Sequence, residues 1–182
     1  MVAMVEILDR APVDDTGPET QHDTVGHATG PVALRQQASL FRFWEARRGA
    51  AAMPRRDAFD LPDLPPAAIP GAILFGVEPG APGAPPRFRI RYAGNQHAEI
   101  LGREIGRRTV TEAIPLALVR SWLDPLSWVA GHGQPHRGMD SLAGIGKPYI
   151  TMHWLRLPLA GADGAVTCIL GHDAFVWQNR AG

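Results

Sequence analysis

Two histidines, His132 and His136, stand four residues apart, a spacing that on a helix would turn both imidazoles toward one metal ion. Gly133 and Pro135 fall between them and interrupt such a helix. We therefore interpret the segment as a loop with surface histidines and predict no metal site. The same histidines leave open a small α+β enzyme that uses His132 or His136 as a general base.

The other residues that could do chemistry have plainer interpretations. His153 and His172 fall in two apolar segments near the C-terminus, where a histidine is more often a hydrogen-bonded structural residue than a haem ligand. Cys168 is the only cysteine and lies in the apolar run of residues 166–170, so we interpret it as a small buried side chain. No serine stands in a Gly-x-Ser-x-Gly turn. We find no catalytic constellation.

Arginines could instead bind an anionic partner. Arg87, Arg89 and Arg91 alternate with apolar residues, which predicts a strand with one basic and one apolar face. Further arginines that could join this face are Arg47, Arg48, Arg55 and Arg56. An adaptor for acidic proteins or nucleic acid is thus a second alternative, although the formal net charge is zero and we do not expect nucleic-acid binding.

These residues must be positioned by a small set of helices and strands. Apolar residues recur at helical spacing from Leu34 to Arg48, and Gly49 supplies a stop. The apolar stripe of this helix must be buried, and we expect Phe41 and Trp44 to pack against the same helix of a second chain. Shorter and longer helices are predicted at residues 96–101 and 116–130.

Apolar runs and alternations predict four strands, at residues 72–77, 87–92, 149–159 and 165–176. Residues 72–77 form an uninterrupted apolar run between two Pro-Gly pairs, which is typical of a buried central strand. The last two strands are long and flank Asp163 and Gly164, the turn chemistry that hairpins favour. Five prolines between Met53 and Pro70 predict an extended connector.

An ordered set of short motifs runs through these elements. Its members are Phe43-Trp44-Glu45-Ala46-Arg47-Arg48-Gly49, Met53-Pro54-Arg55-Arg56, Arg87-Phe88-Arg89-Ile90-Arg91-Tyr92, Gly102-Arg103-Glu104-Ile105-Gly106, Leu157-Pro158-Leu159 and Asp163-Gly164. In this order they resemble the stand-alone bacterial PAS-like domains, over roughly residues 34–176. The chain departs from that family at Gly94-Asn95, where the family favours Gly-Thr.

The resemblance implies an α+β fold, with an antiparallel five-stranded sheet, helices on one face and an additional N-terminal helix. It also implies a non-catalytic sensory or protein-interaction module in bacterial signalling, which binds a small ligand, a partner in trans or a second copy of itself. The ligand and any cofactor stay unidentified. The residues expected to line a pocket between the sheet and the helices are Ile73, Phe75, Tyr92, Trp122, Trp154 and Leu170.

Composition agrees with one globular domain, because 182 residues can bury a sizeable core. Residues 1–31 hold six acidic side chains against Arg10 and show no apolar period after residue 8, so we expect a flexible acidic leader, a domain over residues 32–178 and a tail over residues 179–182. A single cysteine excludes an internal disulfide, and no stretch is apolar and long enough to cross a bilayer. We expect a cytoplasmic protein.

The leader should be the first part of the chain that a protease cuts. Because residues 1–30 lack an apolar period that would anchor a helix or strand to a core, their amides should exchange at rates close to those of a random coil. Hydrogen-exchange mass spectrometry of the full chain measures this directly. Strong protection of the leader would instead show that it docks on the basic remainder of the chain.

Overall fold

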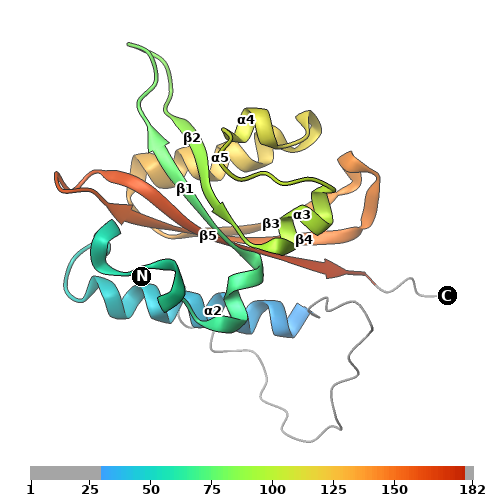
Figure 1. The fold of residues 1–182 in the computed structure, drawn as a ribbon, viewed down its shortest axis with the longest axis horizontal. Coiled ribbons are helices and arrows are strands. Elements are labelled where there is room, and N and C mark those ends of the chain that lie inside the picture. The colour runs from blue at the N-terminus through green and yellow to red at the C-terminus, as the bar shows by residue number, and fades with distance from the viewer. Residues whose placement is uncertain (1–29, 179–182) are drawn as a thin grey trace, which may run out of the picture.

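A five-stranded antiparallel sheet runs through the centre of the computed structural model, which describes residues 30–178 (Figure 1). The strands are β1 (Ala72–Glu78), β2 (Arg87–Ala93), β3 (His136–Leu142), β4 (Lys147–Ala160) and β5 (Val166–Trp177). Their order across the sheet is β2-β1-β5-β4-β3. The first and last strands along the chain are therefore neighbours at the centre, with β2 and β3 at the two edges.

Helices cover both faces of the sheet. They are α2 (Gly30–Arg48), α3 (Asn95–Leu101), α4 (Val110–Ala113) and α5 (Leu116–His132). The last three lie on one face and α2 lies alone on the other (Figure 1). Short 3-10 turns at Arg56–Ala58, Leu61–Asp63 and Pro66–Gly71 make up most of the proline-rich connector between α2 and β1.

Each face of the sheet carries its own hydrophobic core. The α5-side core joins β1, β2 and β5 to α3, α4 and α5, and it includes Ile73, Phe75, Phe88, Trp122 and Leu126. The α2-side core joins α2 and the connector to β1, β4 and β5, and it includes Leu40, Trp44, Leu74, Leu157 and Leu170. The two cores exist because side chains alternate between the faces along each strand.

The predicted fold is confirmed in its class, its five antiparallel strands and its helices. The α2 helix ends before Gly49 and α5 ends before Gly133, and both glycines adopt a positive φ that favours glycine. The expectations for the leader before Gly30 and for residues 179–182 lie outside the described residues. Within residues 30–178, no helix is both long enough and apolar enough to cross a membrane.

The α2 helix packs on the sheet of its own chain. Phe41 is 3% exposed and Trp44 is 1% exposed, and the indole Nε1 of Trp44 donates a hydrogen bond of 2.8 Å to the carbonyl of Pro158 in β4. Their apolar stripe is therefore covered within one chain. We expected Phe41 and Trp44 to face a second chain because the apolar stripe is wider than one sheet edge would need to cover, but the broad face of the sheet in the same chain covers both side chains.

One strand of the sheet, β3, was not predicted from the sequence. β3 begins at His136, in the segment that we interpreted as a loop, and it pairs with β4 along its length. Its residues are mostly half-buried and do not alternate between apolar and polar types, because the strand lies at the sheet edge. Gly138 lies directly against the indole of Trp154, since a Cβ at this position would clash with the ring.

Replacing Trp44 with Phe tests the packing of α2 on its own sheet. The change removes the donor to the buried Pro158 carbonyl and should lower the free energy of unfolding by about 1–3 kcal/mol, measured by urea denaturation. Leu34→Ala, on the more exposed side of the same helix, is the control and should change stability by at most about 0.5 kcal/mol. Equal stability of Trp44→Phe and wild type would contradict this packing.

Candidate functional site

Four of the six predicted pocket residues meet in the space between the sheet and α5. Ile73 and Phe75 point into it from β1, Trp122 from α5 and Trp154 from β4, and all four are buried. Phe75 and Trp122 make an edge-to-face contact, with ring centroids 6.2 Å apart and planes at 78°. The structure thus brings these four residues into one apolar layer beneath α5.

The other two residues, Tyr92 and Leu170, lie on the α2 side of the sheet. Leu170 pairs with Leu74, which neighbours Ile73 and Phe75 but points to the opposite face. Tyr92 also pairs with Leu74, because the register between β1 and β2 shifts by one residue beside it. This bulge moves Tyr92 off the face that Phe88 and Ile90 share, which a strict alternation does not anticipate.

A guanidinium fills the centre of the predicted pocket. Arg156 of β4 is 1% exposed, and its Cζ lies 5.3 Å from the ring centroid of Phe75, 5.6 Å from that of Trp122 and 5.9 Å from that of Trp154. These distances are within the range of a cation–π contact. The three rings form an aromatic cage, and its occupant is a side chain of the protein itself.

Asp173 of β5 balances the caged charge. Its Oδ1 accepts a hydrogen bond of 2.6 Å from Arg156, and its Oδ2 lies 3.0 Å from Nε2 of His97 in α3. All three side chains are at most 1% exposed. A charge-assisted contact of this kind is short and strong, and removing one partner of a buried pair typically costs about 3–5 kcal/mol.

His97 connects this ion pair to the start of α3. Its Nδ1 lies 3.1 Å from the carbonyl oxygen of Gly94, and both that carbonyl and the Asp173 carboxylate can only accept. Both contacts are therefore hydrogen bonds at once only when both ring nitrogens carry hydrogen. Burial alone raises the pKa of Asp173, but the Arg156 guanidinium and the hydrogen bond from His97 outweigh burial and hold that pKa at about 2.

Two hydrogen-bond donors of this centre have no acceptor among residues 30–178. They are Nε1 of Trp122 and Nε of Arg156, and both atoms are buried. A buried donor without a partner costs about 1–3 kcal/mol, so such atoms are uncommon in native proteins. An acceptor from outside the chain that reached these two donors would remove this cost.

A second buried histidine lies on the opposite face. His172 is 1% exposed and neither ring nitrogen has a hydrogen-bond partner in the described part of the chain. Burial lowers the pKa of His172 to about 4, because a protonated ring would lose its hydration there. The facing helix α2 contributes Gln37, whose amide donates to the carbonyls of His153 at 2.9 Å and His172 at 3.4 Å.

The two histidines singled out for catalysis belong to a row of stacked rings. His132 stacks on Trp128 with centroids 4.3 Å apart, and His136 packs on the same indole at 4.5 Å and against Trp154 at 5.2 Å. His132 also lies 2.8 Å from the carbonyl oxygen of Trp128 through Nδ1. Among the described residues, no group of three or more His, Cys, Asp or Glu side chains could hold a metal ion.

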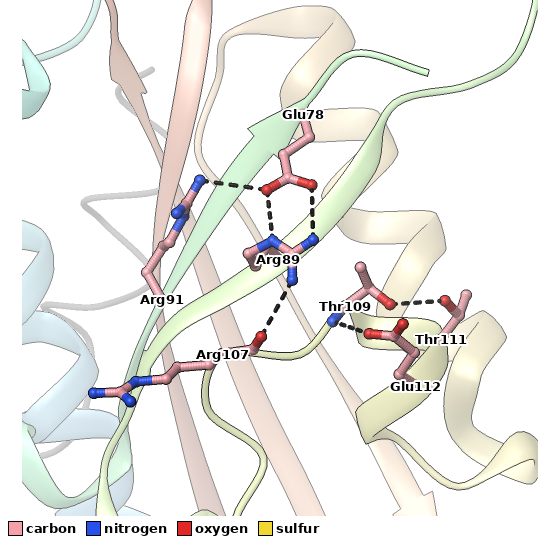
Figure 2. Close-up of polar contacts among 7 residues, drawn as sticks. All are labelled: Glu78, Arg89, Arg91, Arg107, Thr109, Thr111 and Glu112. Carbon is pink, nitrogen blue, oxygen red and sulfur yellow. Dashed lines mark hydrogen bonds and ion pairs between the residues drawn. The ribbon is translucent and has the colours of Figure 1, made fainter. Parts of the chain in front are cut away.

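The basic strand β2 is largely neutralised. Figure 2 shows Arg89 and Arg91 converging on Glu78 of β1, with the closest contact from Arg89 at 2.6 Å and that from Arg91 at 3.3 Å. Arg89 also donates to the carbonyl of Arg107 at 3.2 Å. Two of the three arginines that suggested an anion-binding face thus already have an acidic partner.

Hollows on the surface of residues 30–178 include two that are lined by no residue of the α5-side core. One of about 330 Å³ lies between the end of α2 and the turn after α5, lined by Phe41, Trp44, Glu45, Arg48, Ala52, Gly133, Gln134 and Pro135. The other, of about 560 Å³, lies between the proline-rich connector and the turn before β5. Beneath α5, the buried Arg156 side chain occupies the centre of the space between Phe75, Trp122 and Trp154.

Sequence reasoning missed the charged centre of the site. Arg156 and Asp173 each stand alone in an apolar strand, where an unpaired charge would be unfavourable. One feature of the sequence could have predicted the ion pair: a positive and a negative residue stand in two apolar strands that are joined by one turn. Arg156 and Asp173 are diagonal neighbours in this hairpin, because Arg156 pairs with Gly171 and Asp173 pairs with Trp154. No comparable signal marked His97.

Comparison with protein families gave one result for most of the chain. A family model described as PAS domain matches residues 32–173, which spans α2, the whole sheet up to Asp173 and all the helices between them. Comparison with curated proteins gave no significant match.

The burial of His172 predicts a pH-dependent stability. Below pH 6.5 the unfolded chain binds a proton on His172, whereas the folded chain does so only near pH 4. The free energy of unfolding should therefore fall as the pH drops from about 6.5 to 4, by up to about 3 kcal/mol from this residue. Urea denaturation at a series of pH values measures the fall.

The variant His172→Met isolates this contribution. Methionine fills a similar volume and cannot take up a proton, so the difference in stability between the variant and wild type should grow steadily between pH 6.5 and 4. At pH 7 the variant should be at least as stable as wild type, because no hydrogen bond of the ring is lost. Parallel pH curves for the two proteins would contradict the assignment.

Proposed function

The chain belongs to the PAS domain family, and from this membership we propose that it is a non-catalytic module that passes a signal by contact with another protein in trans. Members of this family act generally as sensory or interaction modules. The space between the sheet and the helices of such a fold can hold a ligand or be filled by side chains. In this chain the side chain of Arg156 occupies the centre of that space, which favours an interaction module over a ligand sensor.

The observation that carries this proposal is the occupied aromatic cage. The Arg156 guanidinium takes the position between Phe75, Trp122 and Trp154 that a ligand would need, and Asp173 and His97 fix it there. Displacing Arg156 would leave the Asp173 carboxylate buried without its main counter-charge. Such a displacement is costly, so the cage is better suited to a structural role than to reversible ligand exchange.

The alternative of an enzyme has less support. A general base needs a free ring nitrogen that is oriented by a second group. His132 uses its Nδ1 near the Trp128 carbonyl, and His136 is held between Trp128 and Trp154 with burial lowering its pKa. Neither ring has a carboxylate partner among the described ion pairs, so we propose that the chain has no catalytic activity of its own.

The alternative of a basic adaptor is weakened by the ion pairs of β2. Glu78 already binds Arg89 and Arg91, and Asp57 binds Arg55 through two hydrogen bonds. An acidic partner would have to compete with these internal carboxylates. The lone Cys168 and the bacterial family that the motifs resemble support a place in cytoplasmic bacterial signalling.

A second candidate function rests on the two unpartnered donors. Nε1 of Trp122 and Nε of Arg156 would both be satisfied by a small acceptor, such as the carbonyl or carboxylate of a metabolite, that reaches the cage. Such a ligand would make the chain a sensor. The identity of the ligand would follow from the mass that the purified protein retains.

Native mass spectrometry of the full chain separates these two functions. We expect the same mass under native and denaturing conditions for each protomer, because the cage is filled by Arg156. A bound small molecule in the native spectrum would overturn the interaction module in favour of the sensor.

An overpacking variant checks the same point through stability. Ile169 lies in the α5-side core and is fully buried, so Ile169→Phe should cost about 1–3 kcal/mol in a space that is already full. Leu116→Phe, on the exposed start of α5, is the matched control and should be nearly neutral. An unchanged melting temperature for Ile169→Phe would show that the space is open.

A further inference from the structure

The two edges of the sheet are covered to different degrees. Along β2, the amide of Ile90 donates to the carbonyl of Arg108 and the amide of Arg107 donates to the carbonyl of Ile90, both at 2.8 Å. The Arg89 side chain holds the same segment through the Arg107 carbonyl, as Figure 2 shows. Residues 107–109 therefore close this edge, and Thr109 continues directly into the capping box of α4.

The opposite edge is open. β3 runs for seven residues, from His136 to Leu142, and pairs with β4 alone. No other described residue makes a backbone hydrogen bond to it. The strand contains no proline and no lysine, and its only irregularity lies at its last residue. Native proteins usually protect long edge strands by such devices, so an open edge of this length needs an explanation.

An exposed apolar side chain lies at the middle of this edge. Met139 is 68% exposed, although the neighbouring residues of β3 are mostly half-buried. The strand holds one basic residue, Arg137, and one acidic residue, Asp140, so it carries little net charge. A second strand can therefore approach without a general electrostatic penalty.

We propose that β3 pairs with β3 of a second copy of this chain, antiparallel and around a two-fold axis, so that two five-stranded sheets join edge to edge. This inference rests on the proposed function, since it names one partner of an interaction module. A second copy fits because an antiparallel edge is complementary to itself. Along the free edge, every second residue points its backbone amide and carbonyl outward. A two-fold axis through one residue places such residues of one copy opposite such residues of the other, so that they can form hydrogen bonds with each other.

The centre of the pairing lies at Gly138 or Met139. With the axis at Met139, the two Met139 side chains meet each other across the junction. With the axis at Gly138, Met139 faces the second copy's Arg137. A seven-residue edge buries less than the roughly 1,200 Å² of a typical stable interface, so the dimer should form only as the concentration rises.

The variant Met139→Lys tests this pairing. In either register the introduced lysine meets a positive charge of the other copy, which is either the same introduced lysine or Arg137, so the dissociation constant of the dimer should rise at least tenfold. Sedimentation velocity over a concentration series measures it. Leu116→Lys is the matched control, because Leu116 is a 91% exposed apolar residue far from β3 in sequence, and it should dimerise like wild type.

A cross-linking variant tests the same pairing without relying on the charge repulsion that Met139→Lys introduces. Under mild oxidation Met139→Cys should give a covalent dimer if the axis lies at Met139, and a mixture of Arg137→Cys and Met139→Cys should give one if it lies at Gly138. Leu116→Cys and the wild type, which holds only the half-buried Cys168, should give none. A wild type that stays monomeric at every concentration would overturn the pairing and leave binding of a different protein intact. The pairing would also be overturned if Met139→Lys dimerised as tightly as wild type, or if Leu116→Lys weakened the dimer and Met139→Lys did not. A retained small molecule would overturn the interaction module instead and leave this dimer untouched.

Discussion

The buried ion pair between Arg156 and Asp173 is the constraint on which the rest of the α5 side depends. Taking two charges out of water is costly, and the pair persists because each charge finds several partners there. Asp173 accepts from Arg156 and lies against His97, while Arg156 lies among three aromatic rings. β4, β5 and α3 each supply one member of this network. None of the three elements can shift alone without exposing or isolating a charge.

This network gives specificity more readily than stability. Well-packed apolar residues of similar volume often replace buried ion pairs without loss of stability. What they cannot do is distinguish one register of the β4–β5 hairpin from its neighbours. A slip of one residue would turn Arg156 or Asp173 to the α2 side, where the leucines of the second core offer no partner. The charges thus exclude the alternatives that an apolar hairpin would tolerate.

The sequence predicted most of the helices and strands, but it predicted much less well on which face of the sheet a side chain lies. The helices could be predicted because Gly49 and Gly133 mark their ends, and β1 because proline and glycine bound its apolar run. The edge strand β3 could not, since a half-buried edge has no clear alternation. Four of the expected pocket residues share one face of the sheet, whereas Leu170 and Tyr92 lie on the other. Their positions depend on the β1–β5 register and on a bulge, and both arise from pairing between segments that are distant in sequence.

One peptide unit of β5 connects the core beneath α2 with the core beneath α5. His172 points into the α2-side core and Asp173, the next residue, points into the α5-side core. The carbonyl of His172 belongs to the bond that joins them, and Gln37 of α2 donates to that carbonyl. A displacement of α2 would therefore pull on the backbone that sets the Asp173 carboxylate, and through it on Arg156 and α3. β5 therefore couples the seating of α2 on one face of the sheet to the position of the Asp173 carboxylate on the other.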